Sequence, residues 1–392
     1  MSDKPMSKYD LRGVSASKSE VHDAIKSMDK GLYPAAFCKV LPDIAGGDKS
    51  YCNIMHADTA GTKTSLAYIY WKETGDLSVW KGVVQDSIVM NVDDMACVGC
   101  IDDIIISSTV GRNKSLIPAE VITEVIQASE AFIQSMAACG VRIHLAGGET
   151  ADVGDIVRTI DVGITAFGRL PRQQVIKNEI KSGDVIVGLA SYGQATYEDD
   201  YNGGMGSNGL TSARHDILDK IYRDRYPESY NPATPKDLVY AGSKQLTDTI
   251  QIGEELIEVG KLILSPTRTY LPVIKEVLTH LRSKVNGMIH CTGGAQTKVM
   301  KFVKNKRVIK DNLLPIPPLF QLIESESNTP RQEMYEVFNM GHRLEMYTDV
   351  SSAHEIIKIS KKYGIDAQII GRVEEHYNNE LVIVDSEGTY RY

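Results

Sequence analysis

The residues with the clearest chemical potential lie in the stretch His56-Ala57-Asp58-Thr59-Ala60-Gly61-Thr62-Lys63. The preceding segment, Tyr51 to Met55, predicts a short strand that stops at Asp58, and a helical pattern begins at Lys63. The small residues between them expose backbone N–H groups, Lys63 adds a cation, and Asp58 can hold the Mg²⁺ that accompanies a nucleotide. The spacing G-x-x-x-x-G-K-[ST] is absent from the chain, so this is not a P-loop. Two interpretations stay open: a polyphosphate-binding turn, or a turn in which Asp and Gly simply end a strand.

Three acids follow in a predicted helix from Val83 to Val98: Asp86, Asp93 and Asp94. Asp86 and Asp93 are seven residues apart and therefore share one helix face. Their apolar neighbours predict that this acidic face is partly enclosed. Buried carboxylates are unfavourable unless cations or hydrogen bonds compensate them, so the helix predicts a site that attracts cations.

A similar pattern recurs in the stretch Leu145 to Asp152. The apolar segment Val141 to Ala146 predicts a strand, Gly147-Gly148 predicts a turn, and Glu149-Thr150 follows it. Each acid taken alone is compatible with a helix surface or a turn. Together, acids at strand ends and on a helix, two of them beside glycine turns, favour a site for a magnesium-bound nucleotide.

Three further islands combine polar residues with tight turns. Ser207-Asn208-Gly209 precedes a helix whose first turn can hold an anion, although a plain helix cap explains it equally well. Ser265 to Tyr270 contains Thr267 and Arg268, and an arginine beside a helix start suits a phosphate or carboxylate. In His290-Cys291-Thr292-Gly293-Gly294 a strand ends in a glycine turn, where His290 can contact either a ligand or the backbone.

The composition of the chain is that of an ordinary soluble protein. Its 392 residues are 42% hydrophobic and 24% charged, with a net charge of −8, which predicts two or three globular domains and no nucleic-acid partner. The basic cluster Lys298 to Lys310 is interpreted as a solvated helix face. Neither a secretory signal nor a membrane span is predicted, and six scattered cysteines suit reduced thiols, so we expect a cytoplasmic protein. Cys97 and Cys100 are expected to pack a helix end rather than bind zinc.

The elements that must position these residues form two α/β halves. We expect an N-terminal domain at 1–170 and a C-terminal domain at 171–392, because Leu170-Pro171-Arg172 separates two alternating patterns. Helices are predicted at 17–30, 118–139, 210–224, 270–284, 295–303, 318–324 and 351–363. Strands are predicted at 103–109, 158–167, 184–190, 287–291, 343–347, 367–373 and 380–384. Long polar loops are predicted at 192–206 and 226–237.

Taken in order, these islands resemble the aminoimidazole ribonucleotide synthetase family, also called phosphoribosylformylglycinamidine cyclo-ligase. The resemblance covers nearly the whole chain and adds Glu333-Met334-Tyr335 and Phe338-Asn339-Met340-Gly341 to the motifs above. The first three motifs are common to a wider superfamily that includes selenophosphate synthetase and thiamine-phosphate kinase. The last four look specific to the cyclo-ligase.

The resemblance implies a two-domain α/β (α+β) fold of the PurM-like type, in which an N-terminal mixed sheet forms a dimer barrel and a mixed α/β domain follows. It implies ATP and Mg²⁺ as cofactors, a small-molecule nucleotide substrate, and a homodimer. In the implied reaction ATP phosphorylates the formamide oxygen of formylglycinamidine ribonucleotide. The amidine nitrogen then attacks the activated carbon, and phosphate leaves as the imidazole ring closes in purine biosynthesis. Such chemistry asks mainly for positioning and charge neutralisation.

The resemblance also implies roles for individual residues. The catalytic set is Asp58, Lys63 and Asp94, and the metal set is Asp58, Asp86, Asp93, Asp94 and Glu149. The nucleotide set is Lys26, Asp58, Thr62, Lys63, Asp86, Asp93, Gly147, Gly148, Glu149 and Thr150. The substrate set is Ser207, Asn208, Gly209, Thr267, Arg268, His290, Thr292, Gly293 and Gly294.

The chain departs from the family pattern at several of these motifs. Thr59 and Ala60 replace a Gly-Val pair, Asp93 replaces an asparagine, and Tyr33 to Cys38 replaces a glycine-rich stretch. A Gly-Pro-His-Ser-Asn-Gly turn becomes Gly193, an insert at 194–206, and Ser207-Asn208-Gly209, so the family's histidine is missing there. Gly294-Ala295-Gln296 stands where the family has a third glycine, and Gly341-His342-Arg343 replaces a Gly-Val-Gly.

These departures leave two alternatives to the cyclo-ligase. One is another superfamily enzyme that phosphorylates a different small molecule. The other is a protein that binds a nucleotide without catalysis.

Overall fold

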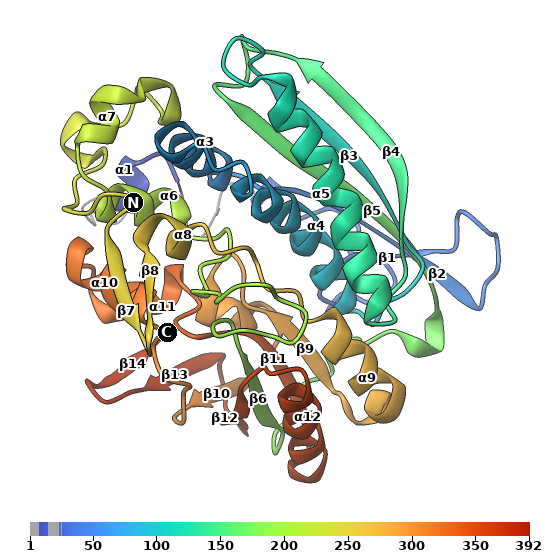
Figure 1. The fold of residues 1–392 in the computed structure, drawn as a ribbon. Coiled ribbons are helices and arrows are strands. Elements are labelled where there is room, and N and C mark those ends of the chain that lie inside the picture. Colours follow the sequence, from blue (N-terminus) through green and yellow to red (C-terminus); the bar gives the residue numbers. More distant parts are fainter. Residues whose placement is uncertain (1–7, 15–22, 25) are drawn as a thin grey trace.

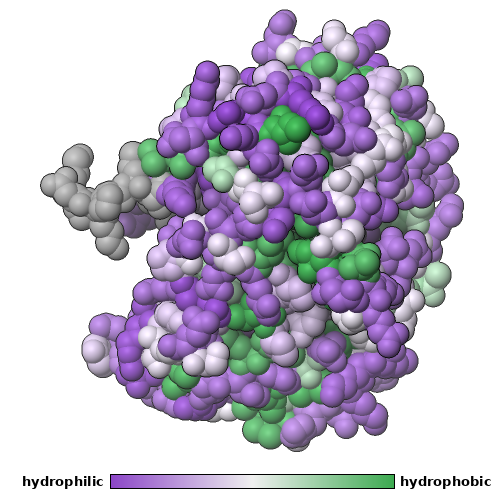
Figure 2. All heavy atoms as spheres, turned by 60° about the vertical axis from the view of Figure 1, so that its left-hand side comes forward, coloured by the Kyte–Doolittle hydropathy of each residue, from purple (hydrophilic) through white to green (hydrophobic). Residues whose placement is uncertain are grey.

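The computed structural model describes residues 8–14, 23–24 and 26–392, which form two mixed sheets with helices packed between and around them (Figure 1). The predicted helix at 17–30 lies largely outside the described residues. Helix α1 (Lys8–Leu11) comes first. On the face drawn in Figure 2 most of the surface is hydrophilic, and hydrophobic residues gather near its middle.

The N-terminal sheet has the order β1 (Val40–Pro42), β2 (Tyr51–Thr59), β5 (Ile160–Pro171), β3 (Ile104–Arg112) and β4 (Ile143–Asp152). Only the β3–β4 pair within this sheet is parallel. Helices α4 (Val79–Ala96) and α5 (Ala119–Ala138) pack against one face, and α3 (Lys63–Thr74) packs against α4. The first sheet therefore places β2 and its terminal Asp58 next to the acidic helix.

The two covering helices differ in how they are buried. Helix α5 has one apolar stripe at helical spacing, from Val121 to Met136, and its other side is exposed. Helix α4 is buried on nearly every side from Val83 to Ala96, because it lies between the first sheet and the C-terminal half. Its acidic residues are therefore enclosed, as the sequence predicts.

The opposite face of the first sheet carries no helix among the described elements. Strand pairing places Met55, Phe167 and Ile105 side by side on this face. Met55 is 62% exposed and Ile105 is 43% exposed. Strand β4 at the edge is exposed along most of its length, on both faces. The sheet thus presents an apolar face and an unpaired edge to solvent.

The C-terminal sheet has seven strands in the order β14-β13-β10-β12-β6-β11-β9. Their bounds are β6 Val185–Ala190, β9 Gly287–His290, β10 Lys306–Lys310, β11 His342–Thr348, β12 Ala367–Glu375, β13 Glu380–Val384 and β14 Thr389–Arg391. Helix α12 (Val350–Lys362) packs on β6 and β12 and against α9 (Leu271–Leu281). Strands β9 and β11 form the end of the sheet that faces α4, through His290 and Arg343.

Apart from η1, the remaining elements follow β6 in the sequence, and α6, α7, α10 and α11 lie on the left-hand side of Figure 1. The α-helices are α6 Leu210–Ile217, α7 Ile221–Arg225, α8 Val259–Ile263, α10 Pro318–Ser327 and α11 Arg331–Val337. The 3₁₀-helices are η1 Arg172–Gln174, η2 Pro227–Ser229, η3 Lys236–Leu238, η4 Arg282–Lys284 and η5 Ala295–Lys301. A hairpin of β7 (Thr249–Ile252) and β8 (Glu255–Glu258) was not predicted.

Three predicted elements were wrong. The Gly147-Gly148 turn is instead a bulge inside β4, which continues to Asp152, and Gly147 has φ +94° there. The helix predicted at 210–224 breaks at Leu218 into α6 and α7, because Leu218 is extended and bridges to Lys244. The basic cluster at 298–310 is not a solvated helix face, since it comprises η5 and the internal strand β10, in which Lys310 is fully buried.

Candidate functional site

Helix α4 is the centre of the candidate site, and its first acid, Asp86, joins the two halves of the chain. The Lys63 ammonium donates to Asp86 at 2.9 Å and to the Ser265 carbonyl at 2.7 Å. The backbone N–H and hydroxyl of Thr267 donate to the same carboxylate at 2.7 and 2.6 Å. Asp86 and Lys63 are both fully buried, and burial lowers the pKa of Lys63 while the Asp86 charge opposes that shift. The pair therefore holds the start of α3 against the 265–267 segment.

Asp93 makes a second connection of this kind, about two turns further along α4. It accepts hydrogen bonds from the Thr269 hydroxyl at 2.6 Å and from the Tyr270 backbone N–H at 2.8 Å, immediately before α9. Burial raises the pKa of Asp93 to about 7, although both hydrogen bonds act in the opposite direction. This carboxyl therefore changes its charge near neutral pH.

Asp94 lies between two histidines. His290 Nδ1 is 2.7 Å from one carboxylate oxygen, and His56 Nε2 is 3.4 Å from the other. Arg343 Nε donates to His290 Nε2 at 3.1 Å, and because arginine is never an acceptor, His290 must carry its proton on Nδ1 and donate it to Asp94. Burial lowers the pKa of His290 to about 4, so the ring is neutral at pH 7. Burial opposes ionisation of Asp94, but nearby Lys298 and the two histidines hold its pKa below the usual value.

Asp58 and His56 are on the face of β2 that α4 covers. The Asp58 side chain is half-buried, and His56 Nδ1 lies 2.9 Å from Asn91 Oδ1 on α4. Glu149 lies elsewhere: it is exposed on β4, with β5 and β3 between it and β2. Its pairing with Thr109 and then Gly163 and Thr59 puts it on the uncovered face, about 14 Å from β2.

The five predicted magnesium ligands therefore do not converge within one chain. Asp86, Asp93 and Asp94 already accept hydrogen bonds from protein donors, Asp58 is accessible beside α4, and Glu149 lies on the other face of the sheet. The arrangement does not fit a single ion held by all five carboxylates, because one ion needs its oxygens at 2.0–2.1 Å.

The predicted substrate turns do come together near the start of α3. Thr62 Oγ1 is 2.6 Å from Thr211 Oγ1 in the first turn of α6, which Gly209 opens with φ +78°. Asn208 Nδ2 lies 3.8 Å from the position that a Cβ on Gly293 would take. The turns 207–209 and 292–294 thus face each other beside the 60–63 turn. The remaining predicted residue, Lys26, is exposed in the N-terminal segment.

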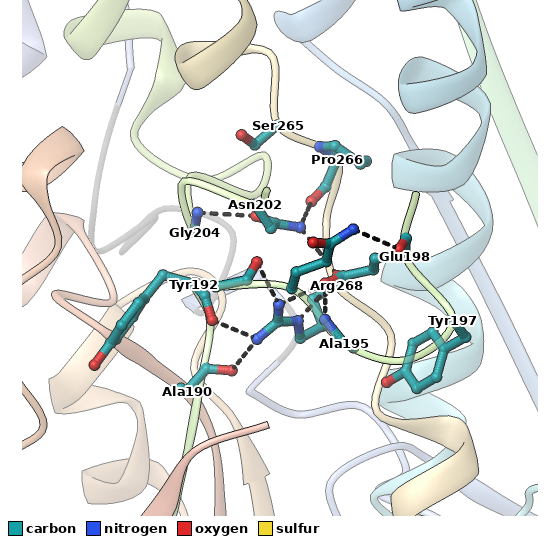
Figure 3. A network of polar contacts seen from close by, with 12 residues as sticks. Ala190, Tyr192, Ala195, Tyr197, Glu198, Asn202, Gly204, Ser265, Pro266 and Arg268 are labelled. Atoms are coloured by element: carbon teal, nitrogen blue, oxygen red, sulfur yellow. Dashed lines mark hydrogen bonds and ion pairs between the residues drawn. The ribbon is translucent and has the colours of Figure 1, made fainter. Parts of the chain in front are cut away.

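Arg268 holds the 194–206 insert in place (Figure 3). Its guanidinium donates to the carbonyls of Ala190, Tyr192 and Gly193 and forms an ion pair with Glu198. These contacts use all five N–H groups of the side chain, which is 1% exposed. A ligand phosphate could reach Arg268 only by displacing Glu198.

The insert is a compact loop with its own internal bonds. Gly193 and Asn202 pair as an isolated bridge, and Asn202 Nδ2 donates to Glu198 and to the Pro266 carbonyl. Its outer side borders a cavity of about 640 Å³ between α4, α5 and β8. The predicted site residues do not line this cavity, so the insert separates it from the turns described above.

Sequence reasoning missed several charged residues near the site. Lys298 contacts the Thr292 hydroxyl and lies 4.6 Å from the centre of the Phe37 ring, so the 292–294 turn meets the 33–38 stretch, which departs from the family pattern. Arg343 was also missed. The available signal was that two charged residues, Arg343 and Glu345, fall in the predicted strand 343–347, since a charge in a buried strand needs a partner.

A second buried cluster lies behind the 292–294 turn. Cys291, His342 and Glu345 offer potential ligand atoms within 4.8 Å of one another. Lys310 already contacts Glu345 and donates to the side chain and carbonyl of Gln296, and Tyr347 also donates to Glu345. The Lys310 ammonium supplies the positive charge beside Glu345. We therefore interpret the cluster as a structural hydrogen-bond network that connects β10, β11 and η5.

Comparison with known families identifies the class of protein. A family model described as AIR synthase related protein, N-terminal domain, matches residues 37–170, and the corresponding C-terminal model matches residues 181–384. The chain belongs to the AIR synthase related family, which confirms the predicted resemblance.

Curated relatives carry one particular name. A protein named phosphoribosylformylglycinamidine cyclo-ligase from Methanocaldococcus jannaschii is 30% identical over 82% of this chain and 78% of its own length. A protein of the same name from Methanobrevibacter smithii is 28% identical over 97% of this chain and 96% of its own length. These names denote enzymes, as predicted.

Solved structures support the two-domain fold. AaThiL complexed with AMPPCP and TMP aligns with a TM-score of 0.54 at 11% identity, covering 100% of both chains. A chain of a HypE–HypF complex aligns with a TM-score of 0.54 at 13% identity, covering 96% of this chain and 98% of that one. The predicted PurM-like fold class is confirmed. Among the described residues, no helix has the length and apolar character needed to cross a membrane.

Proposed function

We propose that this chain catalyses the ATP-dependent closure of formylglycinamidine ribonucleotide to aminoimidazole ribonucleotide. The observation that carries the proposal is the cyclo-ligase name of relatives that match both halves of the chain. In this proposal ATP phosphorylates the formamide oxygen, the amidine nitrogen attacks that carbon, and phosphate leaves as the ring closes. In this proposal the chain divides into an N-terminal domain (1–170) and a C-terminal domain (171–392).

The geometry supports a division of labour among the site residues. The substrate lies between the 207–209 and 292–294 turns, with the accessible Asp58 carboxylate and the Asp94–His290 pair beside it. The buried Lys63–Asp86 pair and the Asp93 contacts position α3, α9 and the 265–270 segment. Arg268 positions the insert instead of binding phosphate.

A second copy of the chain completes the proposed assembly as a homodimer. The uncovered face with Met55, Phe167 and Ile105, together with the exposed edge strand β4, is apolar and extended enough to pair with its equivalent. Pairing would also bring Glu149 into a new environment. Gel filtration with light scattering tests this directly: we expect a dimer for the wild type and a monomer for Met55→Lys/Ile105→Lys.

The activity is tested by measuring ADP release from Mg-ATP with and without formylglycinamidine ribonucleotide, and by assaying aminoimidazole product in the same tubes. We expect ADP that depends on the ribonucleotide and matches the product in amount. ATP binding without turnover would favour a non-catalytic nucleotide-binding protein. ADP release that a different small molecule stimulates would favour another phosphorylating member of the superfamily.

A further inference from the structure

Arg343 is a buried cation without a carboxylate partner. It is 2% exposed, and its guanidinium donates from Nε to His290 Nε2 at 3.1 Å and from Nη2 to Met90 Sδ at 3.4 Å. Among the described residues, no carboxylate oxygen lies within 4.0 Å of its guanidinium, and Nη1 finds no acceptor. A guanidinium removed from water in this way is unfavourable unless something negative compensates it.

The nearby acids do not serve as that partner, because each is paired with other groups; Asp86 Oδ2, which accepts no hydrogen bond, lies 2.9 Å from the Lys63 ammonium. Asp86 accepts from Lys63 and Thr267, Asp93 from Thr269 and Tyr270, and Asp94 from His290. Burial lowers the pKa of Arg343. The charges of these acids, together with Tyr270, oppose that shift without contacting the guanidinium. Among the described residues, Nη1 of Arg343 therefore has no acceptor, and Nη2 has only the weakly accepting sulfur of Met90.

A second set of unsatisfied groups lies directly beside Arg343. Nη1 lies against Gly206, where a Cβ would be 1.4 Å away, so only glycine fits. The next two residues have buried side-chain oxygens without a hydrogen-bond partner among the described residues: Ser207 Oγ, which can donate to an anion, and Asn208 Oδ1, which only accepts. Helix α6 begins two residues later at Leu210, and its first-turn N–H groups favour an anion.

We infer that Arg343 is an anion-binding residue of this site and that its ligand is a phosphate group, held between the guanidinium and the Ser207-Asn208-Gly209 turn. A phosphate oxygen accepts from the arginine fork and from Ser207 and the backbone N–H groups of the turn. This inference deepens the proposed function, on which the choice of ligand rests. The sequence pattern had placed the phosphate at Arg268, whereas the contacts move it to Arg343, which stands where the family has glycine.

Two phosphates could occupy the position: the 5′-phosphate of the ribonucleotide, or a phosphate of ATP. The test is titration calorimetry of the wild type, Arg343→Met and Arg343→Lys with ribose 5-phosphate and, separately, with ATP. Arg343→Met should weaken binding of one probe about tenfold to a hundredfold, and Arg343→Lys should recover part of the loss, because lysine keeps the charge without the fork. The affected probe identifies the source.

Arg268→Met is the matched control, since it removes an equally buried arginine whose donors are all paired. Arg268→Met should lower the melting temperature, whereas ligand-free Arg343→Met should melt at or above the wild-type temperature. If Arg343→Met leaves the affinity for both probes unchanged, or if Arg343 proves as necessary for stability as Arg268, the inference is overturned. Because the assay needs no turnover, it gives its answer even if the cyclo-ligase activity is not found.

Discussion

Arg268 and Arg343 are two arginines of nearly equal burial, 1% and 2% exposed, with opposite surroundings. Three carbonyls and Glu198 satisfy every donor of Arg268, so it belongs to the scaffold. Arg343 has one histidine and one sulfur as acceptors, so part of its charge is left for a ligand. Burial alone does not separate structural from functional charges; the count of satisfied donors does. The acids also differ in their surroundings: Asp86 is fully buried and accepts hydrogen bonds from Lys63 and Thr267, whereas Asp58 is half-buried on β2.

The most damaging change should be the removal of a fully buried charge that has several partners. Asp86→Ala would leave the Lys63 ammonium buried without its partner and take away the acceptor of Thr267. We expect a loss of about 3–5 kcal/mol in the free energy of unfolding, measured by urea denaturation. A double variant, Asp86→Ala/Lys63→Met, should recover part of this loss. Equal stability of Asp86→Ala and wild type would remove this pair from the scaffold.

An accessible acid should behave in the opposite way. Asp58→Asn keeps the shape of the side chain and, because Asp58 is half-buried, should leave the melting temperature within a few degrees of the wild type. We expect kcat to fall by about a hundredfold or more, the scale of one lost electrostatic contact in a transition state. Steady-state kinetics with both substrates decides the matter. Full activity of a well-folded Asp58→Asn would exclude this carboxylate from the site.

Asp93 is intermediate, because its partners are neutral groups and its charge is variable. Its pKa is raised from the ordinary value for aspartate to about 7, so between about pH 4 and pH 7 the folded protein holds a proton that the unfolded chain has lost. This group therefore makes stability fall as pH rises through that window, with no further change above it. Asp93→Asn should remove that slope and gain on the order of 2 kcal/mol over wild type at pH 8. Urea denaturation at pH 5 and pH 8 provides the comparison, and parallel behaviour of the two proteins would show that Asp93 does not titrate in this window.

The smallest effect is expected where two neutral groups meet between the halves of the chain. Thr62→Val removes the hydroxyl bond to Thr211 but leaves no buried charge unpaired. A loss of about 1 kcal/mol in stability is expected. Thr211→Val should cost a similar amount, and the double variant should cost no more than either single change. Additive losses in that cycle would mean that the two hydroxyls do not interact.

The sequence predicted those features that depend on local pattern. Strand β2, helix α5 and the enclosed acids of α4 follow from apolar periodicity, and the motif order identified the family. It did not predict that Gly147-Gly148 continues β4 as a bulge, because a glycine pair is equally compatible with a turn. It also misjudged β10, whose lysines and arginine resemble a solvated surface until Glu345 and Gln296 of other elements provide partners for Lys310.

The sequence predicted which residues lie in the site better than it predicted what each of them does there. Lys63, Asp86, Thr267 and Arg268 do lie in the region where the halves meet, but their partners come from segments about 20 to 200 residues away in sequence, which no local pattern reveals. Strand order likewise decides that Glu149 and Asp58 stand on opposite faces. Arg343 was overlooked because its significance lies in contacts that are missing, and only the assembled fold shows which donors remain unmatched.

The contacts of Arg268 determine which amino-acid substitutions this region tolerates. Three of its four partners are main-chain carbonyls, at Ala190, Tyr192 and Gly193, which every amino acid possesses. Substitution of Tyr192 therefore leaves the hydrogen bonds of Arg268 intact. Glu198 is the one partner that Arg268 contacts through its side chain. A combinatorial library at the exposed insert positions Gln194, Thr196, Asp199 and Asp200 should accordingly accept many sequences, which makes these positions a place where new surface chemistry can be introduced without moving the turn that follows the insert.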